Sequence, residues 1–206
     1  MKKIILSILV VSLLGIFSCA KDETAPTVML KGESTMDHVL NSEFIEPGFA
    51  AFDDKDGDIT ANVSVSSLDV DNTGEKIITY SVTDTEGNEG SDSRKIIVFN
   101  QANILDGFWS GEYIFPYPSG TKVEYYEEIV SSETVNMELS FNNMGGNSDS
   151  HIIGKLKSNN LTFADQTING KSFSVTSTSL KNNNTLITIE YTLDGQAGIL
   201  VLVKNN

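Results

Sequence analysis

Residues 73–90, TGEKIITYSVTDTEGNEG, decide the fold of the first half of the chain. Within them Ile78, Tyr80 and Val82 alternate with other residues, which is the period-two pattern of a strand with two distinct faces. Later in the same stretch, DTEGN (84–88) has the aspartate, asparagine and glycine chemistry of a tight reversal. The stretch therefore predicts a strand and a turn that leads into a further strand.

The rest of the first half shows the same pattern of short strands and turns. Short β-branched or aromatic runs are separated by clusters of glycine, asparagine and aspartate, and neither half contains a convincing helical period over ten residues. We therefore expect an all-β chain with no helix longer than two turns after Cys19, beginning with a small sandwich over 26–100. The other predicted strands of this sandwich are Thr27–Leu30, Val63–Ser66 and Lys95–Phe99.

Four segments in order resemble a bacterial Ig-like domain of unknown function, a family also found in pesticidal crystal proteins and in many surface lipoproteins. They are Thr24-Ala25-Pro26, EPGFAAFDDKDGDIT (46–60), residues 73–90 and RKIIVFN (94–100). The resemblance covers about residues 24–100. It implies an Ig-like β-sandwich used as a spacer or adhesion module, usually without catalysis, and it implies no particular ligand.

Residues 104–206 predict a second domain, an antiparallel β-meander. The acidic balance differs between the halves, with 17 acidic and 6 basic residues in 19–100 against 11 and 6 in 101–206. The polar, aperiodic stretch 100–103 between them predicts a linker and hinge. About eight strands suit an up-and-down barrel, which leaves no exposed edges, better than a two-sheet sandwich. The predicted strands are Gly107–Tyr117, Val123–Val130, Val135–Phe141, His151–Lys157, Leu161–Phe163, Ser172–Ser179, Thr185–Leu193 and Gly198–Val203, with type I′ turns at Asn169-Gly170 and Asp194-Gly195.

The first of these strands opens with GFWSGEY (107–113), which resembles the GxW start of lipocalin-type barrels. In that family an arginine near the end packs on the tryptophan, and here the final strand has only Lys204. Strand parity puts four aromatic residues on one face, where they are more often core than a ligand platform. Adjacent Tyr125 and Tyr126 must face opposite ways, which leaves at least one of them for contact with a ligand. The candidate ligand-binding residues are Trp109, Tyr113, Tyr117, Tyr125 and Tyr126; Phe115 completes the stripe.

The N-terminus predicts export and lipidation. Lys2 and Lys3 precede an apolar run, residues 4–16, that is too short to span a bilayer but fits a secretory signal. Ile16-Phe17-Ser18-Cys19 then resembles the lipobox of bacterial lipoproteins, whose cysteine is acylated. This reading makes residues 1–18 a signal peptide and 19–25 a lipidated tether; the alternative is an ordinary cleavage site with Ser18 and Ala20 as the small residues.

The residues after Cys19 suggest where the anchored protein faces. Lys21, Asp22 and Glu23 resemble the lysine-plus-acidic signal by which some Gram-negative lineages move lipoproteins to the outer face of the outer membrane. An acidic tether is also typical of any solvated linker. We expect a protein that is lipid-anchored in the outer membrane and faces the exterior, with the inward orientation as the alternative.

Four carboxylates crowd one loop of the first domain and form a weak calcium candidate: Asp53, Asp54, Asp56 and Asp58. Hard cations bind several oxygen ligands at such density. The glutamate that closes an EF-hand loop is absent, since the twelfth position from Asp54 is Val65. The favoured alternative is local: Asp58 caps a short turn at 59–62, and Gly57 supplies a positive φ.

The remaining chemistry is sparse. The net charge of −14 and the lack of a basic cluster after Lys3 exclude nucleic acid as a partner. The two histidines, His38 and His151, fall in different predicted domains without a nucleophile or second ligand nearby in sequence. A carboxylate pair could hydrolyse glycosides, but the second-half glutamates are expected at solvated strand positions, namely Glu124, Glu127, Glu128 and Glu133.

These observations leave three functional hypotheses, none of them an enzyme and none with a resident cofactor beyond weak calcium. The favoured one is a surface binding module, in which the Ig-like domain is a stalk and the second domain binds a glycan, another extracellular polymer or a surface protein. A lipocalin-like carrier of a small apolar ligand follows if the second domain is hollow. A purely structural envelope lipoprotein follows if it is filled and exposes no aromatic platform.

The membrane anchor gives the first prediction. Cys19→Ser removes the only thiol in the chain, and with it the acyl chains, each buried methylene of which contributes about 0.8 kcal/mol to membrane binding. We expect the variant in the soluble fraction and the wild type with the outer membrane. A membrane-bound Cys19→Ser protein would contradict the lipidation prediction.

Overall fold

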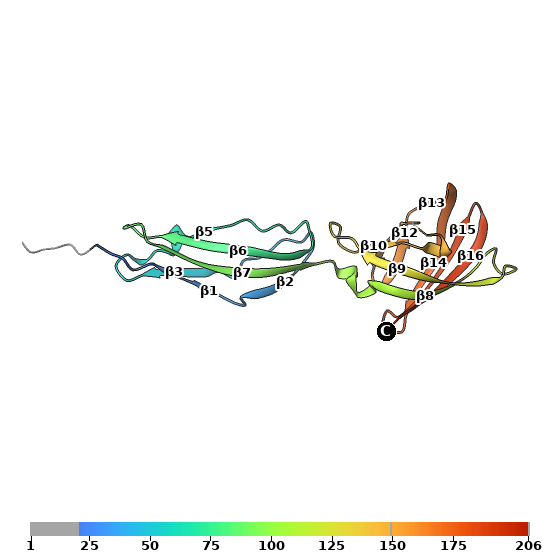
Figure 1. Ribbon diagram of the computed structural model, residues 1–206, viewed down its shortest axis with the longest axis horizontal. Helices are drawn as coiled ribbons and strands as arrows, with labels where there is room; N and C mark the ends of the chain where they lie inside the picture. Colours follow the sequence, from blue (N-terminus) through green and yellow to red (C-terminus); the bar gives the residue numbers. More distant parts are fainter. Residues whose placement is uncertain (1–20, 149, 206) are drawn as a thin grey trace, which may run out of the picture. The chain divides into compact units, whose positions relative to one another are not determined.

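The computed structural model describes residues 21–148 and 150–205, and it is all-β over this part of the chain (Figure 1). Its helical segments there are short 3-10 turns, η1 (Thr60–Asn62), η2 (Gln101–Leu105) and η3 (Met144–Gly146), which confirms the expected absence of long helices within these residues. None of the helices described is long and apolar enough to cross a membrane. The predicted signal peptide and Cys19 lie outside the described residues.

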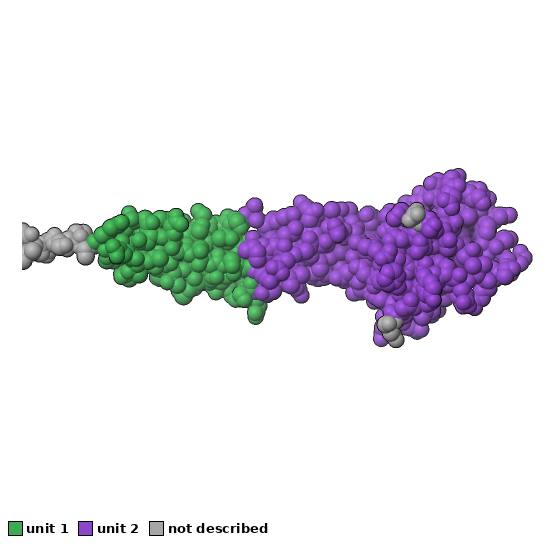
Figure 2. All heavy atoms as spheres, viewed as in Figure 1, with its two compact units in different colours: residues 1–34, 47–66, 78–94 green, residues 35–46, 67–77, 95–206 purple. Residues whose placement is uncertain are grey.

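Contacts divide the chain into two compact units, coloured separately in Figure 2. The first contains residues up to Ser34 together with 47–66 and 78–94, and the second contains 35–46, 67–77 and 95–206. The predicted domains, 26–100 and 104–206, are a different division and stay a prediction.

The first unit contains a three-stranded antiparallel sheet of β1 (Thr27–Leu30), β3 (Phe49–Asp53) and β4 (Gly57–Asp58). A second sheet has the order β2-β7-β6-β5, from Thr35–Val39, Glu89–Phe99, Gly74–Thr83 and Ser64–Val65, with β2 parallel to β7. Along β6 the predicted face is confirmed, because Ile78, Tyr80 and Val82 are buried while Thr79 and Ser81 are exposed.

A buried arginine organises the core of the first unit. Arg94 is fully buried on β7, on the same face of the strand as Ile96 and Val98. Its guanidinium donates to the carbonyls of Lys31 (2.8 Å) and Glu33 and to the Tyr80 hydroxyl (3.3 Å). A buried charge is tolerated only when it is hydrogen-bonded, so Arg94 fixes the 31–33 loop against β7.

In the second unit, one nine-stranded antiparallel sheet curls into a half-barrel. Its order is β12-β11-β10-β9-β8-β16-β15-β14-β13, so the first strand of this sheet in the chain, β8, pairs with the last, β16. The predicted meander is confirmed, the sandwich alternative is wrong, and the sheet is a half-barrel. The strands are β8 (Gly107–Ile114), β9 (Lys122–Ser131), β10 (Glu138–Phe141), β11 (Ile152–Lys157), β12 (Asn160–Phe163), β13 (Gln166–Ile168), β14 (Lys171–Lys181), β15 (Leu186–Leu193) and β16 (Gln196–Lys204).

The ladder is interrupted between β12 and β13, although these strands are consecutive in the chain. Side chains bridge the interruption. The Gln166 amide accepts from the Ile153 amide N–H (2.7 Å) and donates to its carbonyl (2.8 Å), as a neighbouring strand would. The Thr178 hydroxyl bonds the Leu161 carbonyl (2.6 Å) and the Asn160 side chain (2.7 Å). These bonds hold the two edges together without continuous pairing.

The interior of the half-barrel is filled. Trp109 is fully buried and donates its indole N–H to the Leu105 carbonyl at 3.0 Å. The Lys204 ammonium lies 5.6 Å from the centre of its ring and donates to the Ile104 carbonyl at 2.7 Å. Lys204 thus makes a cation–π contact with the indole ring. Around Trp109 the core includes Leu105, Ile129, Leu139, Phe141, Ile152, Phe173, Ile187, Ile189, Leu200 and Leu202.

The turns confirm the glycine signals of the sequence. Asn169 and Gly170 have φ of 51° and 78°, and Asp194 and Gly195 have φ of 48° and 78°. Positive φ at both central residues is what a type I′ turn requires. These two turns therefore set the β13–β14 and β15–β16 registers.

The predicted hinge segment is ordered around one side chain. Asn100 is buried and caps η2 by accepting from the Ala102 N–H at 2.9 Å. It also accepts from the Met137 N–H and donates towards three carbonyls of the 132–138 loop. One asparagine thus satisfies several backbone groups that would otherwise be buried without partners.

Asn100→Ala tests this arrangement. Leaving these groups unpaired costs about 1–3 kcal/mol, so the free energy of unfolding should fall by roughly 2 kcal/mol in urea denaturation. Asn103→Ala, an exposed asparagine three residues further on, is the matched control and should change it little. Equal effects of the two variants would contradict the role assigned to Asn100.

Candidate ligand-binding site

The predicted aromatic candidates lie on two different faces of the half-barrel. Trp109 is fully buried, so its predicted role as a contact residue is not supported by its position: the indole faces the core. Tyr113 and Tyr125 are partly buried and pack against that core. Tyr117 and Tyr126 are exposed, and Tyr126 retains 72% of its surface.

The inner tyrosines fill the space that a carried ligand would need. Tyr113 meets Tyr125 edge to face, with ring centres 5.8 Å apart. Tyr125 lies on Gly111, where an added Cβ would be 2.5 Å from a ring carbon, and Tyr191 lies on Gly198 in the same way at 2.4 Å. The two glycines are therefore required by close packing of aromatic rings over a strand.

Glu127 is a correction to the sequence analysis. It was expected at a solvated strand position, but it is fully buried beside Trp109 in the β8–β9 register. Strand parity explains this, since Tyr125, Glu127 and Ile129 share the inward face of β9. One carboxylate oxygen accepts from the Asn143 N–H at 2.7 Å, and the other has no hydrogen-bond partner.

Burial decides the charge of this group. Loss of solvent raises the pKa of Glu127 from 4.5 to about 7, against the lowering effect of the backbone N–H groups. Burial, and next the charge of Glu127, raise the pKa of the Tyr125 hydroxyl, which also lacks a hydrogen-bond partner. Glu127 and the Tyr125 hydroxyl are both buried on the inward side of β9.

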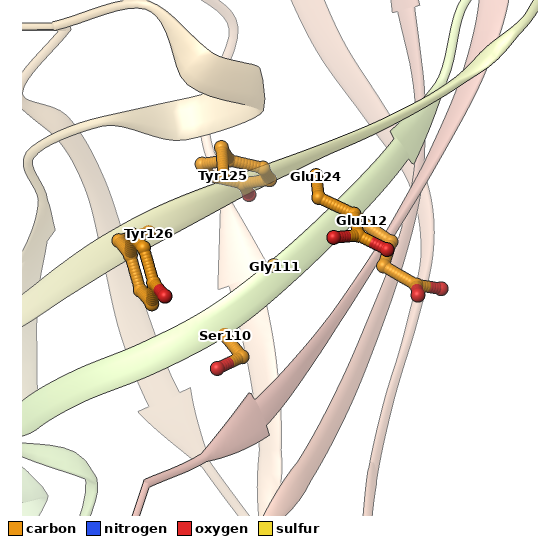
Figure 3. A pocket seen from close by; sticks show the side chains of 6 residues that line it. All are labelled: Ser110, Gly111, Glu112, Glu124, Tyr125 and Tyr126. Atoms are coloured by element: carbon orange, nitrogen blue, oxygen red, sulfur yellow. The ribbon is translucent and has the colours of Figure 1, made fainter.

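A groove of about 350 Å³ runs over the outer face of β8 and β9 (Figure 3). Cross-strand pairing builds it, because Ser110 lies opposite Tyr126 and Glu112 lies opposite Glu124. Figure 3 shows Tyr126 and Ser110 at one end and the two glutamates at the other. The lining residues are Ser110, Gly111, Glu112, Glu124, Tyr125 and Tyr126.

Neighbouring side chains hold polar groups at both ends of the groove. Lys122 forms a 2.5 Å ion pair with Glu112, and this hydrogen bond raises the pKa of Lys122. The Ser110 hydroxyl donates to the Asn205 side chain at 2.7 Å. The groove therefore presents an aromatic ring, a hydroxyl and carboxylate oxygens, of which those of Glu124 are the more exposed.

Sequence reasoning proposed Tyr126, which lines the groove, but not the polar residues that line it beside Tyr126. Tyr125 and Tyr126 do face opposite ways, as adjacency in a strand requires. The signal that could have placed these residues on one face is their even numbering: Ser110 and Glu112 on one strand, and Glu124 and Tyr126 on the other. Only the pairing register shows which residue of β9 lies opposite which residue of β8.

The predicted calcium loop divides in the structure. Asp58 accepts from the Thr60 N–H at 3.0 Å, and hydrogen bonds from the Thr60 hydroxyl and amide lower the pKa of Asp58. Gly57 has a φ of 73° and η1 follows, as the local alternative expected. Asp56 accepts from the Thr85 N–H and hydroxyl. Asp53 and Asp54 instead lie beside Asp22. The four aspartates therefore do not surround one site as the ligands of an EF-hand loop do.

Part of the first half of the chain matches a family model. Residues 28–98 match the family model of the bacterial surface protein Ig-like domain. This agrees with the resemblance over 24–100 and with the two sheets described above. The match ends before the half-barrel begins.

The solved structures that match this chain are distant. A lipoprotein of Bacteroides thetaiotaomicron is 20% identical, covers 87% of this chain and 100% of its own, and has a TM-score of 0.42. The CBM51-2 and INT domains of Clostridium perfringens ZmpB, in complex with GlcNAc, are 17% identical over 86% of this chain and 43% of theirs, at a TM-score of 0.30. Curated proteins gave no match. Likeness at this level assigns no ligand.

Glu127 makes stability depend on pH in a defined direction. Because its pKa is higher in the folded protein, the folded state holds a proton that the unfolded chain has lost between pH 4.5 and about 7. The contribution of the protonated Glu127 to the free energy of unfolding is complete below pH 4.5 and is lost as the pH rises to about 7. At about 1.4 kcal/mol per pH unit, the free energy of unfolding falls by about 3 kcal/mol over this range.

Glu127→Gln should remove this slope and raise the free energy of unfolding at pH 8, as measured by urea denaturation. Glu133→Gln, at an exposed position, is the control and should keep the wild-type slope. A Glu127→Gln profile parallel to the wild type would show that the buried carboxyl is not the source.

Proposed function

We propose that the protein is a non-catalytic, lipid-anchored protein of the bacterial surface whose half-barrel binds a neutral glycan through the outer groove of β8 and β9. The observation that carries this proposal is the Tyr126 ring, 72% exposed at one end of a groove whose other end holds two glutamates. Exposed aromatic rings offer a flat apolar face to a sugar, and carboxylates accept hydrogen bonds from its hydroxyls.

The charge of the groove supports a neutral ligand. Lys122 partly compensates Glu112, while Glu124 adds a further negative charge. Together with the net charge of −14, this disfavours anionic polymers. The lining offers no histidine or cysteine and no serine–base pair. Of its two carboxylates, that of Glu112 is paired with Lys122, so we propose binding without turnover.

The surface location rests on two separate features. Residues 28–98 are of a domain type described from bacterial surface proteins, and the lipobox resemblance at Cys19 supplies an anchor. In this proposal the Ig-like domain is the stalk, and Lys21, Asp22 and Glu23 direct the protein to the outer face of the outer membrane. The filled interior argues against the alternative of a lipocalin-like carrier.

A glycan array with the purified protein, followed by calorimetry on the selected glycan, tests the proposal. Tyr126→Ala should weaken binding about tenfold or more, since one aromatic contact contributes about 1.5 kcal/mol. Glu124→Gln should weaken it less, because an amide oxygen still accepts hydrogen bonds.

Tyr117→Ala is the matched control, because Tyr117 is also exposed but does not line the groove. It should bind as the wild type does. Loss of binding in Tyr117→Ala with retention in Tyr126→Ala would move the site elsewhere. A protein that binds no glycan but retains a co-purified lipid in native mass spectrometry would favour the carrier hypothesis. A protein with neither a bound glycan nor a bound lipid would favour the structural role.

A further inference from the structure

Carboxylates from three separate segments converge in the first compact unit. Oxygen atoms of Asp22, Asp53 and Asp54 lie within 4.8 Å of one another, and the same holds for Asp22, Asp84 and Glu86. Asp22 belongs to both groups. It comes from the segment predicted to be a solvated tether, yet only 2% of its surface is exposed.

Two of these carboxylates are buried with one oxygen left over. Asp53 is 8% exposed, and its Oδ1 accepts from the N–H groups of Lys55 and Asp56, both at 2.9 Å. Asp22 Oδ1 accepts from the Thr24 N–H at 3.0 Å and pairs with Lys55 at 3.3 Å. The Oδ2 atoms of Asp22 and Asp53 have no hydrogen-bond partner. Buried oxygens without partners are costly, and a cation would satisfy both.

The surrounding loops hold these oxygens in place before any ion binds. Asp56 bonds Thr85 at 2.8 and 2.9 Å and so ties the 53–58 loop to the 84–88 turn. Asn88 donates to the Asp22 carbonyl at 3.2 Å and to Asp84 Oδ2 at 2.6 Å. A site assembled in advance loses less entropy on binding.

We infer that the first unit binds a calcium ion through Asp22, Asp53 and Asp54, with Asp84 and Glu86 beside it. The donors are all hard oxygens, from the end of β3 and from irregular segments, which suits the variable geometry of calcium better than the strict octahedron of magnesium. Asp56 and Asp58, which the sequence grouped with Asp53 and Asp54, serve as loop supports instead. Lys55 already neutralises part of the charge, so we expect a dissociation constant of ~10⁻⁴ M, as in other extracellular modules.

This site does not depend on the glycan groove. Its consequence concerns the anchor, because Asp22 follows Cys19 by three residues. Bound calcium would fasten the start of the mature chain to the Ig-like domain. It would also restrict the access of other proteins to the Lys21-Asp22-Glu23 signal.

The test is calorimetric titration of calcium chloride into the protein purified in detergent and freed of metal with EGTA. Hydrogen exchange of the 21–24 segment, with and without calcium, gives the local readout. We expect a dissociation constant of ~10⁻⁴ M, a rise in melting temperature of roughly 5 °C at saturation, and slower exchange at Thr24.

Asp53→Asn keeps an oxygen acceptor for the N–H groups that bond Oδ1 and replaces the free oxygen with an uncharged NH2 group that cannot bind a cation. It should weaken calcium binding at least about tenfold and, in EGTA, melt at or above the wild-type temperature because repulsion is relieved. Asp58→Asn is the matched control and should bind as the wild type does. The proposal would be overturned if about 5 mM calcium, about fifty times the expected dissociation constant, gave no heat of binding and no shift in melting temperature. It would also be overturned if Asp53→Asn and Asp58→Asn weakened calcium binding equally.

Discussion

The pairing of β8 with β16 is the interaction on which the rest of the second sheet depends. It joins the first and last strands of the sheet over six residue pairs, from Ile199–Ile114 to Lys204–Trp109. At its end Trp109 is buried, bonded to the Leu105 carbonyl and covered by the Lys204 ammonium. This closure places the free edges at β12 and β13, where Gln166 and Thr178 bridge them. It therefore makes a curled half-barrel out of a plain meander.

The same closure separates a filled interior from an exposed outer face. Once Trp109 points inward, parity sends Ser110 and Glu112 outward, and the β8–β9 register sets Tyr126 and Glu124 opposite them. Inside, Gly111 and Gly198 leave room for the rings of Tyr125 and Tyr191. The outer groove and the packed interior thus both follow from the same β8–β9 register. The proposed glycan is assigned to the outer groove.

Local patterns in the sequence were enough to predict much of the fold. The alternation through Ile78, Tyr80 and Val82, the Asn169-Gly170 and Asp194-Gly195 turns, and the opposite faces of Tyr125 and Tyr126 each depend on neighbouring residues alone. β13 was missed, because Gln166–Ile168 is too short to show a period. Glu127 was misplaced, because a charged residue suggests solvent even where parity indicates the core.

The sites were harder to predict because they join residues far apart in the chain. Asp22 meets Asp53 and Asp84 only after the sheets form, and no spacing rule relates them. Lys204 reaches Trp109 across 95 positions because the last strand returns to the first. Tyr126 could be named as a contact residue, but its partners Ser110 and Glu124 follow from pairing alone.

The most direct test of the account is to map which residues of the protein a bound glycan perturbs. Backbone and aromatic NMR spectra of the protein titrated with a panel of neutral oligosaccharides distinguish the outer groove from the interior. The account predicts shift changes at Ser110, Glu112, Glu124 and Tyr126, with the signals of Tyr113 and Tyr191 unmoved. Changes centred on Tyr113, Phe115 and Tyr191 instead would contradict it and place the ligand inside the half-barrel.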